Sequence, residues 1–237
     1  MSVHRPLRRR ARLAGAVAAL AVLATGAAVT APVGAAPATG GSAPCPTVAP
    51  GPFRFTFTSE LTNGTIDLNG KGTATGASAS VCGTIAPSGG QLVATVPQAN
   101  ISFSPVTVNI FGFLPVQTQV VPVGDQVGTA SLGGGINVTL SGPVVAETNL
   151  LGFRCDVGPF TPTLTTGTSG ALTGTPFSGN PSTGALVSND FDVPRIAPSR
   201  TCPRIVAFFS NLALGLPAPA GASSIAFDAT QVLTPVR

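Results

Sequence analysis

Residues able to transfer protons are scarce in this chain. The sequence has one histidine, His4, and neither tryptophan nor tyrosine. Because His4 lies in a segment that is typical of an export signal, the processed protein is expected to contain no imidazole. Imidazole is the side chain that most often serves as a general base near neutral pH. The sequence therefore argues against the commonest hydrolytic mechanisms.

The remaining routes to hydrolysis are weak. Without histidine, the one amine available to activate a serine is Lys71, which stands between Gly70 and Gly72 in an expected hairpin turn. Solvent at such a turn keeps an ammonium group charged and unable to act as a base. The sequence also has neither a Gly-x-Ser-x-Gly elbow nor a Ser-x-x-Lys motif. We expect no catalytic residue and no enzyme.

Paired carboxylates are the alternative that stays open. Asp190 and Asp192 flank Phe191, and on a strand they would share one face. Two acids across a cleft suffice for a glycosidase, and carboxylates also bind calcium. A solvated strand edge explains the pair equally simply, and a sugar cleft would be expected to offer Trp or Tyr. A hydrolase that uses carboxylates alone is thus a third-ranked function.

The beginning of the chain has the pattern of a secretory signal peptide over residues 1–35. Five arginines without any acid precede an apolar run from Leu13 to Val29, and the small residues Val33-Gly34-Ala35 suit a cleavage site. The tandem arginines leave the twin-arginine export route open. A retained membrane anchor is disfavoured, because the run is rich in Ala and Gly and slightly short for a span. We expect a secreted protein, extracellular or associated with the cell envelope, without an integral anchor.

Removal of this signal changes the charge of the protein. The formal charge of +4 includes five arginines of the signal, and the remaining seven basic and eight acidic residues leave a net charge of −1. Binding to nucleic acid requires clustered cations, which a near-neutral chain with scattered arginines does not supply. Nucleic acid and anionic membrane surfaces are therefore poor candidates as partners.

Four cysteines remain after processing: Cys45, Cys82, Cys155 and Cys202. An even number of cysteines in an exported chain indicates disulfides, and three pairings are possible. We favour Cys45 with Cys82 and Cys155 with Cys202, because each bond would then staple one half of the chain. A metal site would need CxxC spacing or histidine partners, and neither exists. We expect no cofactor.

The hydrophobic pattern predicts an all-β fold, either a sandwich or a barrel of antiparallel strands. Phe53, Phe55 and Phe57 alternate with polar residues, and Ile66 and Leu68 repeat this alternation before Asn69-Gly70. That dipeptide favours a tight hairpin turn. Further strands are expected at 79–85, 91–96, 101–110, 116–123, 127–132, 136–141, 144–150, 162–173, 185–193 and 224–233.

One segment has helical periodicity instead. Between Pro203 and Leu214 the apolar residues Ile205, Val206, Phe208, Phe209 and Leu212 recur at helical spacing, and Gly215 and Pro217 end the pattern. The sequence predicts a single amphipathic helix near 203–214, capped by Thr201, with its apolar face packed on the sheet. Docking of a partner on that face is the less favoured alternative.

The domain organisation follows from these patterns. Residues 36–50 are rich in Ala, Pro, Gly and Ser and are expected to form a flexible leader. Residues 51–237 are expected to form a single β-rich domain, with two halves, 45–125 and 145–235, as the alternative.

The late half of the chain resembles a group of secreted, uncharacterised actinobacterial β-rich proteins. The resemblance covers residues 145–235 and is carried by Leu150-Leu151-Gly152-Phe153-Arg154-Cys155, by the 170–176 and 189–194 segments, and by Cys202-Pro203 and Gly215-Leu216-Pro217. These are turn and core residues. The resemblance therefore implies export, disulfides and the fold, but no site residue.

Two classes of function remain. The first is a non-catalytic β-protein that acts by surface contact or as a structural module of the envelope. The second is a carrier of an apolar, lipid-like ligand, in which Phe103, Phe111, Phe113, Phe208 and Phe209 would line a cavity. A drug-sized ligand needs roughly 300 Å³ or more of unfilled apolar volume. The volume and lining of the interior therefore discriminate between the two.

Overall fold

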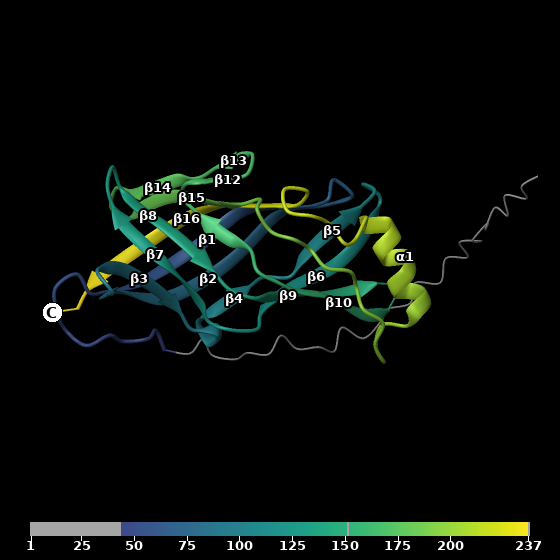
Figure 1. The fold of residues 1–237 in the computed structure, drawn as a ribbon, viewed down its shortest axis with the longest axis horizontal. Coiled ribbons are helices and arrows are strands. Elements are labelled where there is room, and N and C mark those ends of the chain that lie inside the picture. Colours follow the sequence, from purple (N-terminus) through teal and green to yellow (C-terminus); the bar gives the residue numbers. More distant parts are fainter. Residues whose placement is uncertain (1–43, 151, 237) are drawn as a thin grey trace, which may run out of the picture. The chain divides into compact units, whose positions relative to one another are not determined.

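A computed structural model describes residues 44–150 and 152–236. The expected signal, 1–35, and residues 36–43 of the expected leader lie outside this part of the chain. The described residues form antiparallel strands, one α-helix and two disulfides, which confirms the predicted all-β fold (Figure 1).

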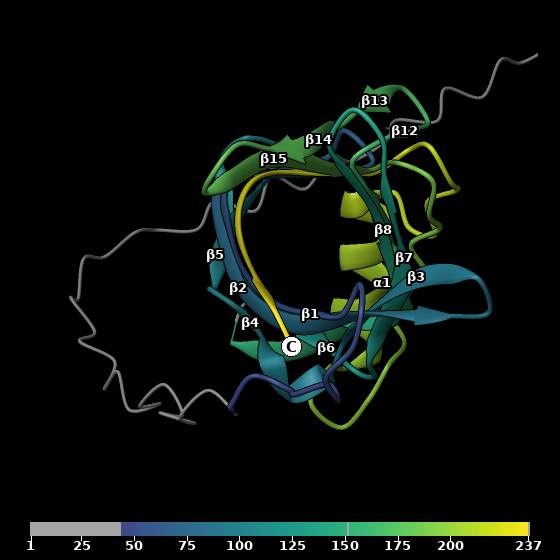
Figure 2. The same ribbon diagram turned by 90° about the vertical axis from the view of Figure 1, so that its left-hand side faces the viewer.

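Eight strands close into an antiparallel barrel, the second of the two architectures expected (Figure 2). The pairing of the first two strands completes the ring, with Phe55 opposite Ile85 at one end and Leu68 opposite Gly72 at the other. Closure satisfies the backbone groups that an open sheet leaves at its edges. The order around the ring is β1 (Phe55–Leu68), β16 (Ser224–Pro235), β15 (Ser182–Ser188), β11 (Thr163–Thr165), β8 (Ile136–Ser141), β7 (Gln126–Leu132), β3 (Gln91–Val96) and β2 (Gly72–Ser88).

The sheet continues beyond the ring from the long strand β2. Besides β1 and β3, β2 pairs with β4 (Ile101–Phe103) and β5 (Val106–Ile110). From β5 an extension follows in the order β6 (Leu114–Pro122), β9 (Val144–Leu150) and β10 (Phe153–Phe160). The smaller elements are β14 (Thr175–Ser178), which pairs with β15 and β8, the two-stranded β12 (Thr168–Ser169) and β13 (Leu172–Thr173), and a 3-10 turn at Gln98–Asn100.

Strand β10, Phe153–Phe160, is not among the strands predicted from the sequence. The alternation of Phe153, Cys155 and Val157 is interrupted by Gly158 and Pro159, so the pattern stops halfway along the strand. The structure continues the strand across a shift of register between Val157 and Phe160. A bulge of this kind is not visible in a period-two pattern.

The β1–β2 hairpin confirms the turn expected at Asn69-Gly70. Both residues have positive φ, 52° and 62°, and Lys71 N donates to Leu68 O at 2.9 Å. Positive φ at both central positions defines the type I′ turn that fits the twist of paired strands. Phe53, by contrast, precedes the strand, has a φ of 56° and is exposed, so the expected triplet of ring-bearing strand residues is reduced to Phe55 and Phe57.

Two apolar clusters form the core. The first fills the ring and includes Phe57, Leu61, Val96, Phe177 and Phe227. The second lies under the extension and is centred on the Cys155–Cys202 disulfide, with Val157, Phe160, Phe191 and Ile196 around it. Phe160 and Phe191 stack with their ring centroids 5.7 Å apart. The second cluster thus fastens the 191–202 segment, and with it the helix, to β10.

Both expected disulfide pairs are confirmed. Cys45 is bonded to Cys82 and Cys155 to Cys202, with Cα–Cα distances of 5.5 and 4.9 Å. Cys155 and Cys202 are fully buried. The ring contains strands from both the early half (45–125) and the late half (145–235) of the chain, because β1 pairs with β2 on one side and with β16 on the other.

Candidate functional site

The single α-helix, α1 (Arg204–Leu214), lies at one end of the barrel (Figure 1). It begins after Pro203 without a side-chain cap, so the expected cap at Thr201 is wrong. The hydroxyl of Ser199 instead accepts from Cys202 N at 3.0 Å, which shapes the loop before the helix. Gly215, with a left-handed φ of 64°, ends the helix as expected.

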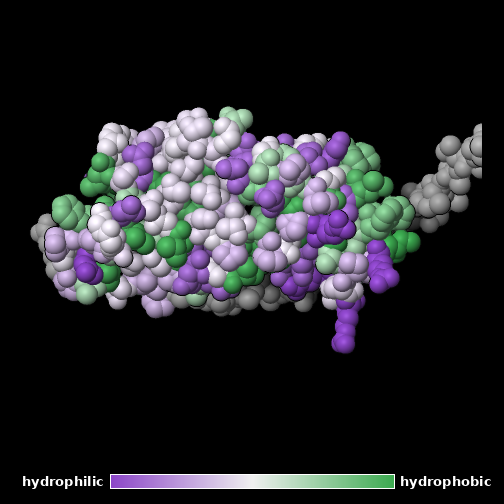
Figure 3. Space-filling model, viewed as in Figure 1, coloured by the Kyte–Doolittle hydropathy of each residue, from purple (hydrophilic) through white to green (hydrophobic). Residues whose placement is uncertain are grey.

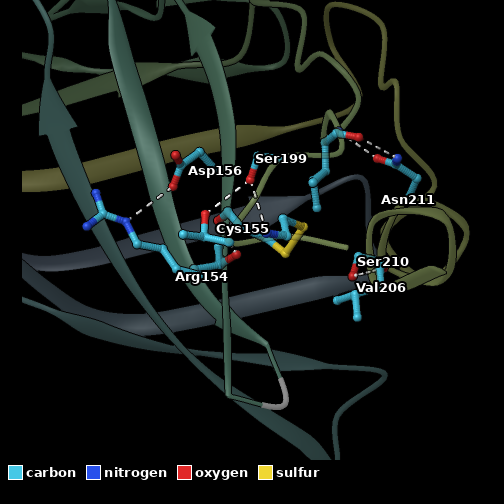
Figure 4. Close-up of a disulfide and its surroundings, with 11 residues drawn as sticks. Arg154, Cys155, Asp156, Ser199, Val206, Ser210 and Asn211 are labelled. Atoms are coloured by element: carbon cyan, nitrogen blue, oxygen red, sulfur yellow. Dashed lines mark hydrogen bonds and ion pairs between the residues drawn. A yellow bond between two sulfur atoms is a disulfide. The ribbon is translucent and has the colours of Figure 1, made fainter. Parts of the chain in front are cut away.

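Polar bonds and the disulfide fix the position of α1 (Figure 4). Asn211 accepts from Ile196 N at 2.7 Å and donates to Ile196 O at 2.9 Å. Just after the last turn of the helix, Asn69 donates to Gly215 O at 2.9 Å. Cys202 joins the start of the helix to β10. These contacts hold the helix rigidly, so the face that it turns outward is presented in one orientation.

That outward face is apolar, which contradicts the expectation that it would be core. The buried side of α1 consists of Ala207, Ser210 and Leu214. Four of its five largest apolar side chains point to solvent, with exposed fractions of 66% for Ile205, 63% for Phe208, 58% for Phe209 and 70% for Leu212. The helix is apolar on both sides, so its periodicity identified a helix without indicating which side would be buried.

Aromatic side chains from two hairpin turns extend this exposed surface. Phe111 and Phe113 lie in the β5–β6 turn. This turn is bonded to the β1–β2 turn, because Phe111 N donates to Lys71 O. The β1–β2 turn is bonded in its turn to the end of α1 through Asn69. Phe153 begins β10, two residues before the disulfide. We call the surface formed by these residues the apolar end, and Figure 3 shows hydrophobic side chains gathered there. Its members are Phe111, Phe113, Phe153, Ile205, Phe208, Phe209 and Leu212.

A cavity of about 120 Å³ is the second candidate site. Strands of the ring and strands of the extension both contribute to its wall. Apolar side chains from both core clusters line it, including Phe57, Phe103, Phe160, Phe177 and Phe227. Of the described residues that form this wall, none carries a charge. The volume is below the roughly 300 Å³ that a drug-sized ligand needs, so the cavity suits a slender apolar group.

The expected ligand-lining residues separate in the structure. Phe103 lines the cavity. Phe111, Phe113, Phe208 and Phe209 do not, and belong to the apolar end instead, with Phe113 the most exposed at 76%. Phenylalanine can occupy either position, and sequence alone does not distinguish a ring in a wall from a ring at a turn.

The expected carboxylate pair does not form a catalytic cleft. Asp190 and Asp192 follow the end of β15 and are exposed, while Phe191 between them is buried against Phe160. Asp192 accepts a hydrogen bond from Ala220 N at 2.8 Å and so stabilises a loop. Among the described residues, the ion pairs join Arg154 to Glu147 and, at 3.7 Å, to Asp156; Figure 4 shows the pair with Asp156. Within the described residues, no group of three potential metal ligands is found.

Fold and site together define a class: a disulfide-linked, closed antiparallel barrel with a mostly apolar interior and one helix that exposes four large apolar side chains. No family model, curated protein or solved structure matches the chain. In the described part of the chain, no helix has the length and apolarity required to span a membrane.

Proposed function

We propose that the chain is an exported, non-catalytic carrier that encloses a slender apolar ligand in its barrel. The cavity is the observation that supports this proposal. Protein interiors normally leave few voids larger than a water molecule, and one water needs roughly 10–15 Å³. A cavity of about 120 Å³ exceeds this need several-fold.

Energetics favour an occupant for this space. At roughly 24 cal/mol per Å³, an unfilled cavity of this size would cost the fold about 3 kcal/mol. Most of the wall is apolar, so over most of its surface a water molecule lacks the two to four polar partners that it requires. An engineered apolar cavity of about 150 Å³ in another protein binds benzene. A single alkyl chain or one small ring therefore suits the space better than a larger ring system.

Filling the cavity should abolish carriage. Ala94 and Ala146 are buried and line the cavity, so Ala94→Leu and Ala146→Leu each place a larger side chain where the ligand would lie. Native mass spectrometry of the protein, purified without detergent from its source organism, should show a stoichiometric apolar adduct. We expect each variant to lose most of that adduct.

The matched control is Thr95→Leu, because successive residues of a strand point to opposite faces and Thr95 is not part of the cavity wall. This variant should retain the adduct. Thermal unfolding of all three variants checks that each one folds. A wild-type protein without adduct that also binds no added alkane or alkanol would refute the carrier proposal.

The apolar end favours a second function, contact with an apolar surface of the cell envelope. Its side chains project from a rigid helix and two turns, and exposed apolar patches commonly mark interaction sites. Aromatic rings bury much area at low entropic cost. Phe208 and Phe209 lie edge to face with centroids 5.5 Å apart and form its centre.

We expect the double variant Phe208→Ser and Phe209→Ser to lose co-sedimentation with vesicles of phosphatidylcholine, a lipid without net charge. Its unfolding free energy should stay within about 0.5 kcal/mol of wild type, as is usual for exposed positions. If these rings were core, the loss would instead be several kcal/mol. Leu132→Ser is the control, since Leu132 is 62% exposed and ends strand β7, outside the apolar end. Equal sedimentation of both variants would exclude the apolar end as the contact surface.

A further inference from the structure

Two buried polar atoms on the cavity wall have no hydrogen-bond partner. They are the hydroxyl oxygen of Ser59 on β1 and the amide oxygen of Gln231 on β16. Their residues are 4% and 3% exposed. Buried polar groups are nearly always hydrogen-bonded, so each such exception requires an explanation.

The other polar side chains that border the cavity include several with partners. Ser78 and Ser104 bond each other through their hydroxyls at 3.0 Å. Gln126 donates to Gly124 O at 3.2 Å. Ser59 and Gln231 thus differ from these neighbours, and they line the cavity without a partner from the protein.

The two unpartnered residues are neighbours. Ser59 lies directly opposite Gln231 in the β1–β16 register. Residues so paired point to the same face of the sheet, with Cβ atoms roughly 4.5–5.5 Å apart. Phe57 and Leu61, two residues before and after Ser59 on the same strand, also line the cavity. The pair is therefore a small polar spot on an otherwise apolar wall.

The chemistry of this spot selects one kind of ligand group. The amide oxygen of Gln231 can only accept a hydrogen bond, whereas the hydroxyl of Ser59 can donate or accept. A ligand hydroxyl satisfies both, because it can donate to Gln231 and accept from Ser59. An ether or ester oxygen cannot donate and leaves the Gln231 oxygen unpaired. A carboxylate would be buried among described wall residues that carry no charge, which is strongly unfavourable.

We propose that the ligand, or the part of it that enters the cavity, is a slender apolar group with a hydroxyl, and that Ser59 and Gln231 bind this hydroxyl. The inference rests on the proposed carrier function. It adds a polar recognition point to the apolar cavity and so predicts selectivity among apolar molecules of equal size. Ser59 and Gln231 are binding residues in this assignment, without a catalytic role.

Binding of three matched probes tests the assignment. Pentan-1-ol, hexane and butyl methyl ether have the same number of non-hydrogen atoms as benzene, which suits a cavity of this size, but differ in their ability to donate a hydrogen bond. We expect the delipidated full-length protein to bind the alcohol about tenfold more tightly than either other probe, measured by native mass spectrometry and by ligand-dependent thermal stabilisation. Ser59→Ala and Gln231→Leu should each reduce this preference, while the affinity for hexane is retained.

Both variants should fold. Each removes a polar atom that has no partner in the protein, so stability without ligand should be unchanged or increased. A marked loss of stability would show that these atoms have protein partners and would overturn the assignment. Ether binding as tight as that of the alcohol would also overturn it, because the ether cannot donate.

The failure of this inference and that of the carrier function are distinguishable. If all three probes bind equally to the wild type, and Ala94→Leu abolishes their binding, the carrier stands and the hydroxyl assignment is wrong. If no probe binds, or if Ala94→Leu leaves binding unchanged, the cavity is not a ligand site and both proposals are wrong.

Discussion

Replacement of Cys155 and Cys202 by alanine should lower the free energy of unfolding by about 4 kcal/mol or more. The bond closes a loop with a sequence separation of 47, for which the chain-entropy model gives roughly 4 kcal/mol as a model-dependent upper figure. Both sulfur atoms are also fully buried at the centre of the second core cluster, so their removal leaves space that apolar contacts no longer fill. Urea unfolding of the double variant measures the loss.

The Cys45–Cys82 bond is the matched control. Its sequence separation is 37, so the entropic part of its contribution is nearly the same. Cys45, however, is exposed. We therefore expect the Cys45→Ala and Cys82→Ala double variant to lose less stability than the first variant. Equal losses would mean that packing around Cys155 and Cys202 contributes nothing beyond loop closure.

A second large effect is expected for Gly128→Ala in β7. An added Cβ at this position would collide with backbone atoms of Thr139 and Leu140 in β8, which cannot move without separating the two strands. Overpacking of this kind typically costs about 1–3 kcal/mol, and occasionally more when backbone must shift. We expect the variant to unfold at a clearly lower temperature, measured by circular dichroism.

Gly133→Ala controls for the loss of glycine itself. Gly133 lies in the turn between the same two strands, has no atom near the position of an added Cβ, and does not adopt a positive φ. Its substitution should leave the unfolding temperature within about 2 °C, which corresponds to about 0.5–1 kcal/mol for a chain of this size. If both variants lowered the unfolding temperature by similar amounts, the backbones of β7 and β8 could not be as close at Gly128 as the structure shows.

The fold was largely accessible from the sequence because its signals are local. Alternation of apolar and polar residues indicated most strands, Asn69-Gly70 indicated the first turn, and the even number of cysteines indicated the disulfides. The choice between sandwich and barrel was not accessible, since it depends on the pairing of β1 with both β2 and β16. That pairing joins segments that are distant in the sequence.

The candidate sites were less accessible, for a physical reason. Periodicity reports that a helix has apolar positions, but α1 exposes four large apolar side chains and buries Ala207, Ser210 and Leu214, against the usual preference. A bulge between Thr62 and Thr65 changes which residues of β1 face the cavity. Before the bulge these are Phe57, Ser59 and Leu61, and after it they are Ile66 and Leu68. In the sequence, Ser59 resembles any other strand serine, and only the register places it beside Gln231.

The position of β16 in the ring has a consequence for the order of assembly. Asn63 of β1 and its partner Asp228 of β16 are 165 positions apart, and the ring closes only when β16 has paired with both β1 and β15. Contacts between such distant segments form slowly. We therefore expect ring closure to be a late step of folding, so that the cavity wall is completed after most other strands have paired.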